Sequence, residues 1–196
     1  MKIAIIDYGA GNVKSIEFAL KRLGFESILT SDPITIESAD RVIFPGVGEA
    51  SSAMSMLKRT KLDTLIPNLK QPVLGICLGM QLMCNNCEEG ETQGLNIFDA
   101  DVVKFNTDLK VPQVGWNTIF DLKSELFRGI EENSYMYLVH SFYVPAHHES
   151  IANSDYGITY SVALHKDNFY GVQFHPEKSG KIGEQILKNF IENSNS

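Results

Sequence analysis

The sequence has no long apolar run, no excess of positive charge and no repeats or linkers. No apolar segment in its 196 residues approaches the roughly 20 residues that a membrane-spanning helix needs. The chain carries 17 Lys and Arg against 24 Asp and Glu, and the resulting net charge of −7 argues against a nucleic-acid or anionic-membrane surface. The absence of linkers and low-complexity tracts predicts one domain over residues 1–196.

Cysteine is scarce as well. There are three cysteines, an odd number, and the first apolar run, residues 3–6, is interrupted by Asp7 too early for a secretion signal. We therefore expect reduced thiols and a cytoplasmic protein. Cys84 and Cys87 form a Cys-x-x-Cys pair, but no second pair follows at zinc spacing, so we expect no metal site and no cofactor.

The apolar pattern differs between the two halves of the chain. The amino-terminal half alternates short apolar strands with amphipathic helices, as in βαβ units, and the carboxyl-terminal half is richer in antiparallel strands. Strands are predicted at 3–6, 25–29, 41–44, 73–76, 97–105, 111–120, 135–144, 158–164 and 169–174. Helices are predicted at 13–23, 50–58, 62–69, near 124–127 and at 181–191. Gly9 and Gly11 follow the first strand, but the third glycine of a dinucleotide loop is absent.

Cys77 follows the fourth predicted strand directly and has Gly75 and Gly79 on either side. A strand, a sharp turn and a helix with a nucleophile between glycines is the pattern of a nucleophile elbow. The start of the helix would favour the thiolate over the thiol. Many cysteines are simply small buried hydrophobes, so a catalytic role for Cys77 requires a base elsewhere in the chain.

That base is predicted at His175, which Glu177 follows two residues later. In extended backbone, residues i and i+2 point to the same side, so the carboxylate would orient the imidazole. Cys77, His175 and Glu177 would then form a hydrolytic triad for an acyl group. The alternative for His175 is a packed histidine at a strand end. Among the other histidines, His140 is the one rival base, although its place late in a strand favours the core or the rim.

A loop of the sequence Pro45-Gly46-Val47-Gly48 follows the third predicted strand. It is either a plain turn before the next helix or a source of backbone N–H donors at the rim that Cys77 shares. With the N–H of Leu78, such a donor would form an oxyanion hole.

Together the elbow 75–81, the segment 171–177 and the loop 45–48 closely resemble the class I, or triad, glutamine amidotransferases over nearly the whole chain. Further segments narrow the resemblance to the glutaminase subunits of imidazole glycerol phosphate synthases; they are 7–12, 112–117, 140–142 and 175–179. The sequence departs from that pattern at Gln113-Val114, where His-Met is more usual.

The resemblance implies an α/β fold: an open, mixed, largely parallel sheet flanked by helices, with a smaller antiparallel part in the carboxyl-terminal half. It also implies that the chain hydrolyses glutamine to glutamate and ammonia through a γ-glutamyl thioester on Cys77. Ammonia would pass to a (β/α)₈-barrel synthase subunit, in a 1:1 heterodimer, which converts the ribulosyl phosphate PRFAR into imidazole glycerol phosphate and AICAR in histidine biosynthesis.

The resemblance also implies residue roles. The oxyanion would be held by Gly46, Val47, Gly48 and Leu78. The amino-acid end of glutamine would be bound by Gln81, Glu89, Ser141 and Phe142. The interface with the synthase would include Asn12, Trp116 and Lys178. Core packing is the alternative for Trp116, the one tryptophan. Two rival functions stay open: a glutaminase that serves another synthase, and a non-catalytic binding module that retains the scaffold.

Overall fold

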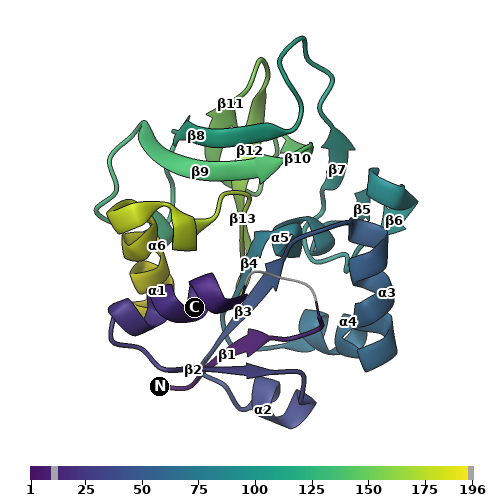
Figure 1. The fold of residues 1–196 in the computed structure, drawn as a ribbon, viewed down its shortest axis with the longest axis vertical. Coiled ribbons are helices and arrows are strands. Elements are labelled where there is room, and N and C mark those ends of the chain that lie inside the picture. The colour runs from purple at the N-terminus through teal and green to yellow at the C-terminus, as the bar shows by residue number, and fades with distance from the viewer. Residues whose placement is uncertain (10–12, 194–196) are drawn as a thin grey trace.

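The computed structural model describes residues 1–9 and 13–193 (Figure 1). Parallel strands form the amino-terminal half of the sheet; they are β1 (Ile3–Ile6), β2 (Ser27–Thr30), β3 (Arg41–Gly46), β4 (Val73–Cys77) and, from the other end of the chain, β13 (Phe169–Val172). They lie in the order β2-β1-β3-β4-β13. β4 ends at Cys77 and β13 ends shortly before His175, and because the two strands pair in parallel, their carboxyl ends are adjacent.

The sheet continues beyond β13 with mostly antiparallel pairing. The added strands are β12 (Thr159–Lys166), β11 (Ser150–Asp155), β10 (Phe142–Pro145), β7 (Asp101–Lys104), β5 (Asn86–Cys87) and β6 (Thr92–Gln93). Within the described ranges this makes 11 strands, and β8 (Gln113–Ile119) and β9 (Ser134–His140) form a separate antiparallel pair. The expected fold class, a mixed and largely parallel sheet with an antiparallel part, is confirmed.

Helices cover both faces of the parallel strands (Figure 1). On one side lie α1 (Val13–Arg22) and α6 (Gly180–Glu192), and on the other α2 (Pro33–Glu37), α3 (Ala50–Thr60), α4 (Leu62–Leu65) and α5 (Leu78–Leu82). Short 3₁₀ turns occur at η1 (Ile66–Asn68), η2 (Glu89–Glu91), η3 (Glu125–Phe127) and η4 (Pro176–Lys178). Of the helices in the described ranges, none combines the length and the apolar character that crossing a bilayer requires.

Two buried clusters, one on each face, share the parallel strands between them. Ile6 and Phe44 pack in the cluster that contains α3 and α5, whereas Ile5 and Ile43 pack with α1 and α6. Successive residues of a strand point to opposite faces, and strands buried on both faces are therefore continuously apolar. This explains why β1, β3 and β4 could be predicted from short apolar runs.

Several element predictions are wrong in extent or missed. The strand predicted at 97–105 shrinks to β7, and the one predicted at 135–144 is broken at Ser141 into β9 and β10. The helix predicted at 124–127 is the 3₁₀ turn η3, and that at 62–69 divides into α4 and η1. Both α2 and β11 were missed, because α2 has only five residues and β11 reads as a polar segment.

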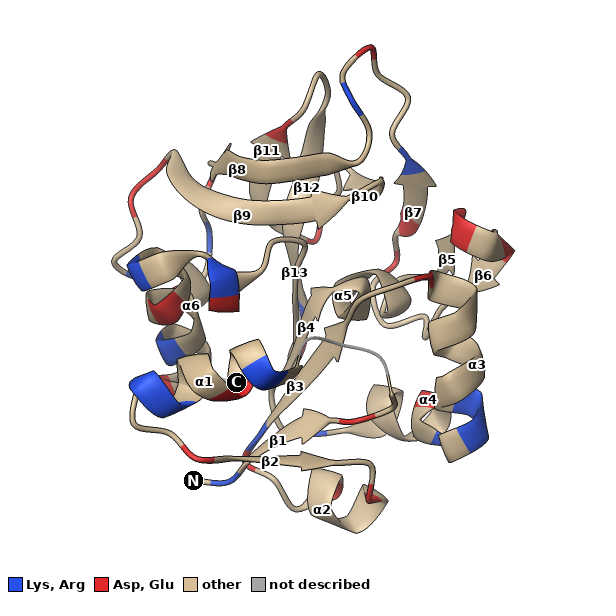
Figure 2. Cartoon of the chain, in the orientation of Figure 1, with Lys and Arg blue, Asp and Glu red and all other residues tan. Residues whose placement is uncertain are grey.

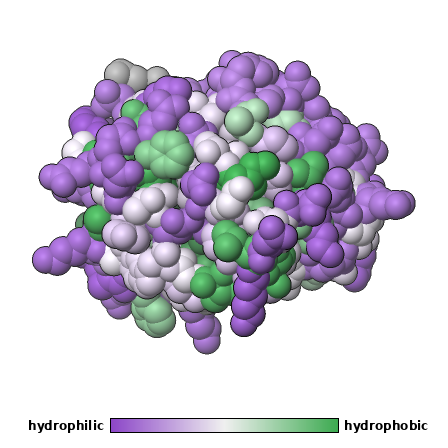
Figure 3. All heavy atoms as spheres, turned by 90° about the horizontal axis from the view of Figure 1, so that it is seen from above, coloured by the Kyte–Doolittle hydropathy of each residue, from purple (hydrophilic) through white to green (hydrophobic). Residues whose placement is uncertain are grey.

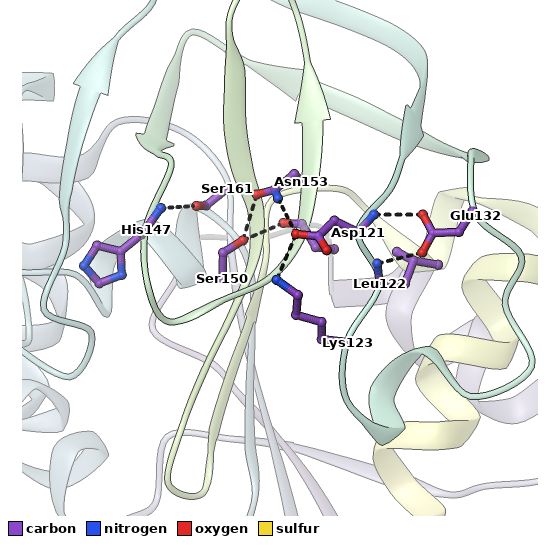
Figure 4. A network of polar contacts seen from close by, with 9 residues as sticks. Asp121, Leu122, Lys123, Glu132, His147, Ser150, Asn153 and Ser161 are labelled. Carbon is purple, nitrogen blue, oxygen red and sulfur yellow. Dashed lines mark hydrogen bonds and ion pairs between the residues drawn. The ribbon is translucent and has the colours of Figure 1, made fainter.

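A polar network connects the end of the β8–β9 pair at which β8 ends and β9 begins to β11 (Figure 4). The carboxylate of Glu132 accepts from the backbone N–H groups of Asp121 and Leu122, at 2.8 and 2.9 Å. The Asp121 side chain in turn accepts from Lys123 Nζ and from Asn153 Nδ2 on β11. These contacts link the segments next to β8 and β9 to β11 of the large sheet.

Candidate active site

Cys77 ends β4 in a backbone conformation that is unusual for a residue with a side chain. Its φ of 54° and ψ of −113° turn the chain sharply into α5. The turn brings α5 very close to β3, because a Cβ atom at Gly79 would lie 2.0 Å from the carbonyl oxygen of Phe44. Only glycine fits there, so the glycine two residues after Cys77 is required for steric reasons. The result is the strand, turn and helix expected of a nucleophile elbow.

His175 and Glu177 meet as the triad hypothesis requires, but by a different route. His175 Nδ1 donates to Glu177 Oε1 at 2.8 Å, and both side chains are buried. The prediction of an extended segment is wrong: Pro176 starts the 3₁₀ turn η4, which Lys178 N–H closes by donating to the His175 carbonyl. The fixed φ of proline favours this first helical position. Among the described residues, the buried Glu177 Oε2 has no hydrogen-bond partner.

The environment of His175 favours its charged form. Burial by itself lowers the pKa of His175, but hydrogen bonds and charge interactions with Cys77 and Glu177 outweigh burial and raise the pKa to about 10. Since Nδ1 is bonded to Glu177, Nε2 is the nitrogen left for the sulfur. At neutral pH the site therefore favours an imidazolium beside the sulfur of Cys77.

A cavity of about 350 Å³ opens over this pair. The volume is within the range of about 300–1,000 Å³ that is usual for small-molecule sites. Most of the expected site residues line it: Val47, Gly48, Cys77, Leu78, Gln81, Glu89, Ser141, Phe142, His175 and Lys178. Pro112, Val139 and His140 complete the lining. Gly46 and Glu177 are not among these lining residues, and no role in the site was predicted for Pro112 or Val139.

The loop expected to hold an oxyanion lies beside the elbow. Gly46, the last residue of β3, is the register partner of Cys77, and the Tyr8 hydroxyl donates to the Pro45 carbonyl at 3.0 Å. Gly48 has φ +100°, a conformation that residues with side chains avoid. Val47 and Gly48 of this loop and Leu78, the first residue of α5, line one cavity.

The residues expected to bind the amino-acid end of glutamine are already partly engaged. Gln81 Nε2 donates to the Phe142 carbonyl at 3.1 Å and to Gln173 Oε1 at 2.8 Å, which leaves Gln81 Oε1 for a ligand. Glu89 Oε2 accepts from Ala50 N–H at 2.9 Å, which leaves Oε1, and burial raises the pKa of Glu89. An acceptor amide and a carboxylate suit an ammonium group.

Gln173 is a contact that the sequence analysis missed. It is fully buried, and its Nε2 donates to Cys77 Sγ at 3.7 Å. The Val139 carbonyl also lies close to the sulfur, at 3.8 Å from Sγ. The one available signal was a polar residue within the apolar run 169–174, since a buried amide must find partners.

His140 is excluded as the base by its surroundings. Nδ1 donates to the Phe142 carbonyl at 2.7 Å, and Nε2 lies 3.0 Å from Gln113 Oε1 and 3.3 Å from the Tyr160 hydroxyl. Burial lowers the pKa of His140 to about 4, so the ring is neutral at physiological pH. Gln113, where the chain departs from the usual His-Met, thus belongs to a buried network.

Trp116 lies on the surface, so the core-packing alternative is wrong. Its exposed fraction is 56%, and it stands on the outward face of the β8–β9 pair beside Val114, Tyr135 and Val139. Neither strand carries Asp, Glu, Lys or Arg (Figure 2), and apolar atoms gather near the middle of the face seen in Figure 3. Lys178 Nζ lies 5.9 Å from the Tyr137 ring centroid at the edge of this surface. Asn12 falls outside the described residues.

Comparisons with known proteins show the family to which the chain belongs. The class-I glutamine amidotransferase family matches residues 4–193. The chain is 57% identical to imidazole glycerol phosphate synthase subunit HisH of Bacteroides thetaiotaomicron, over 98% of this chain and 100% of that protein. It is 49% identical to the protein of the same name in Haemophilus influenzae, over 98% of each chain. The solved structure of PurLQS from Thermotoga maritima has the same fold, with a TM-score of 0.77, 16% identity and 97% of each chain covered. The chain therefore belongs to the class-I glutamine amidotransferase family.

Proposed function

We propose that this chain is the glutaminase subunit of an imidazole glycerol phosphate synthase and that residues 1–196 form its single amidotransferase domain. The observation that carries the proposal is the buried Cys77, His175 and Glu177 group at the floor of a cavity, with the His175–Glu177 hydrogen bond of 2.8 Å. The names of relatives at 49% and 57% identity support the same assignment.

In the proposed reaction, the Cys77 thiolate attacks the side-chain amide carbon of glutamine. The oxygen that becomes negative accepts from Leu78 N–H and from a backbone donor of Gly46, Val47 or Gly48. Imidazolium His175 gives its proton to the amide nitrogen as the C–N bond breaks, which releases ammonia and leaves a γ-glutamyl thioester.

The second half of the reaction returns the site to its starting state. Neutral His175 takes a proton from water while the water oxygen attacks the thioester carbon. The C–S bond breaks, glutamate leaves, and the Cys77 thiolate and His175 imidazolium are restored. Glu177 keeps Nδ1 of His175 protonated in both halves and so fixes which nitrogen faces the sulfur.

The partner is proposed to be a (β/α)₈-barrel synthase subunit, bound 1:1, which uses the ammonia to convert PRFAR into imidazole glycerol phosphate and AICAR. The exposed Trp116 and the uncharged face of β8 and β9 support this docking site. Tryptophan and tyrosine are enriched among the residues that anchor interfaces. Lys178 lines the cavity and lies near Tyr137 of this face, so the interface and the site adjoin.

The test is glutamate release from glutamine by the chain alone, with the barrel synthase, and with synthase plus its ribulosyl phosphate substrate. We expect strong stimulation in the last mixture and none with Cys77→Ala. Turnover in no mixture would contradict the synthase assignment and favour a retained, inactive scaffold. Stimulation by a different synthase would keep the triad chemistry and change the pathway.

A further inference from the structure

The side-chain amide of Gln173 contacts the sulfur of Cys77. The hydrogen bonds around this amide show which end is the N–H donor and which is the carbonyl acceptor. Gln173 follows β13, two residues before His175, and its side chain is fully buried. Its Nε2 lies 3.7 Å from Cys77 Sγ, within the range for an N–H donor and a sulfur acceptor. A buried amide N–H needs an acceptor, and a thiolate is a better one than a thiol because hydrogen bonds to charged groups are stronger.

Gln81 fixes the orientation of this amide. Gln81 Nε2 donates to Gln173 Oε1 at 2.8 Å and to the Phe142 carbonyl at 3.1 Å. If the Gln173 amide were turned over, two NH₂ groups would face one another and its carbonyl oxygen would face the sulfur. The network therefore keeps the N–H of Gln173 directed at Cys77.

The groups around the sulfur act on its two forms in opposite directions. The Val139 carbonyl, 3.8 Å away, can accept from a thiol S–H but offers nothing to a thiolate. Gln173 can donate to a thiolate and adds to the effect of imidazolium His175. The ionisable groups that also face this region are Tyr8, His140, Glu89, Lys178 and, behind His175, Glu177. All of them remain when only Gln173 is changed.

We propose that Gln173 is a further catalytic residue, a neutral N–H donor that stabilises the Cys77 thiolate and is held in place by Gln81. This role deepens the proposed glutaminase function and rests on it for its catalytic meaning. The hydrogen bond strengthens whenever charge returns to sulfur, as it does when the thioester breaks and the thiolate leaves.

The test is the rate of alkylation of Cys77 by iodoacetamide as a function of pH, followed on the Cys77 peptide by mass spectrometry, with Cys77→Ala as the blank. Gln173→Met removes the donor and keeps the length of the side chain. We expect the midpoint of the rate–pH profile to rise by about one unit, and the rate below the midpoint to fall about tenfold, the change that one unit represents. Gln173→Glu places a carboxylate against the sulfur and should raise the midpoint further.

Asn189→Leu is the matched control. Asn189 is another buried amide, which donates to the carbonyls of Leu126 and Arg128 in a different part of the fold, and its loss should leave the profile unchanged. An unchanged midpoint in folded Gln173→Met would overturn the proposal, and so would an equal shift in Asn189→Leu. If Gln173→Met does not fold, the midpoint of Gln173→Leu, which also lacks the donor, decides in the same way.

Alkylation needs no glutamine, so this test and that of the proposed function can fail separately. A shifted midpoint in a chain that hydrolyses no glutamine would support the role of Gln173 at the sulfur and contradict the glutaminase. Glutamine hydrolysis by the wild type together with an unshifted midpoint in Gln173→Met would support the glutaminase and contradict the role of Gln173.

Discussion

At the scale of single residues, the site depends on backbone conformations that most side chains avoid. Cys77 has a positive φ, which costs on the order of 1–3 kcal/mol for a residue other than glycine. The surrounding contacts impose this conformation, since α5 is held against β3 at Gly79. As a result, Cys77 lines the same cavity as Val47, Gly48 and Leu78.

The carboxylate of Glu177 can be tested by Glu177→Gln. The substitution keeps the shape but removes the charge that helps to hold the proton on His175, and it leaves an amide NH₂ where Oε2 has no partner among the described residues. We expect turnover of glutamine to fall by about 10²–10⁴, as for the loss of the orienting carboxylate in a hydrolytic triad. Steady-state glutamate release is the measurement.

Glu192→Gln controls for the loss of one negative charge, because Glu192 is half-exposed at the end of α6. It should keep wild-type turnover. Full activity in Glu177→Gln would show that His175 needs no charged neighbour.

At the scale of helices and strands, the sequence was informative where one physical rule dominated. Strands buried on both faces are uninterrupted apolar runs, so β1, β3 and β4 could be predicted from short apolar segments of the sequence. The β9–β10 break at Ser141 could not, since both strands are rich in aromatic and β-branched residues and the chain changes sheets between them. Pairing partners far along the chain decide such breaks.

The candidate site was predictable in the same uneven way. His175 and Glu177 are two residues apart, so their contact followed from local chemistry even though the turn between them was misread. The cavity-lining Val139 and the buried Gln173 reach Cys77 only through the tertiary arrangement of β9 and β13. No local pattern distinguishes an amide that faces a sulfur from one that fills a core.

The β8–β9 face is the element on which the partner proposal is tested. In Trp116→Ala we expect partner-stimulated glutamate release to fall far more than basal release, because truncation removes a large exposed aromatic anchor from an uncharged surface. Loss of a central anchor of this kind costs about 2 kcal/mol or more, so affinity for the synthase should weaken about thirtyfold. Titration calorimetry with the synthase measures it.

Ile34→Ala gives the matched control, since Ile34 is 75% exposed but lies on α2, on the opposite part of the molecule (Figure 1). Its affinity for the synthase should equal that of the wild type. Equal weakening in both variants would contradict docking on β8 and β9.

At the scale of the whole molecule, two buried histidines should set the pH range of stability. The raised pKa of His175 gives stability that is complete below about pH 6.5 and lost as the pH rises toward 10. The lowered pKa of His140, about 4, gives stability that is complete above about pH 6.5 and lost as the pH falls toward 4. The two contributions leave the fold most stable near pH 6.5.

The loss of stability below pH 6.5 can be tested with His140→Asn. Between pH 6.5 and 4 the wild type must keep a neutral ring that would take a proton if unfolded, so its free energy of unfolding should fall relative to the variant by up to about 1.4 kcal/mol per pH unit. Urea titrations at several pH values measure the slope. His148→Asn removes an exposed histidine, and the difference in free energy of unfolding between it and the wild type should not change over this pH range. A difference between wild type and His140→Asn that stays constant with pH would refute this account.

Val139 belongs both to the exposed face of β9 and to the surroundings of the Cys77 sulfur. Its side chain is 36% exposed on the outward face of β9, opposite Val114, while its carbonyl oxygen lies 3.8 Å from the sulfur of Cys77. A protein that presses on this face would therefore need no relay through the core. A rotation of the single peptide plane at Val139 would remove the acceptor of the thiol proton. A structural change on the surface would therefore alter the surroundings of the sulfur through one residue.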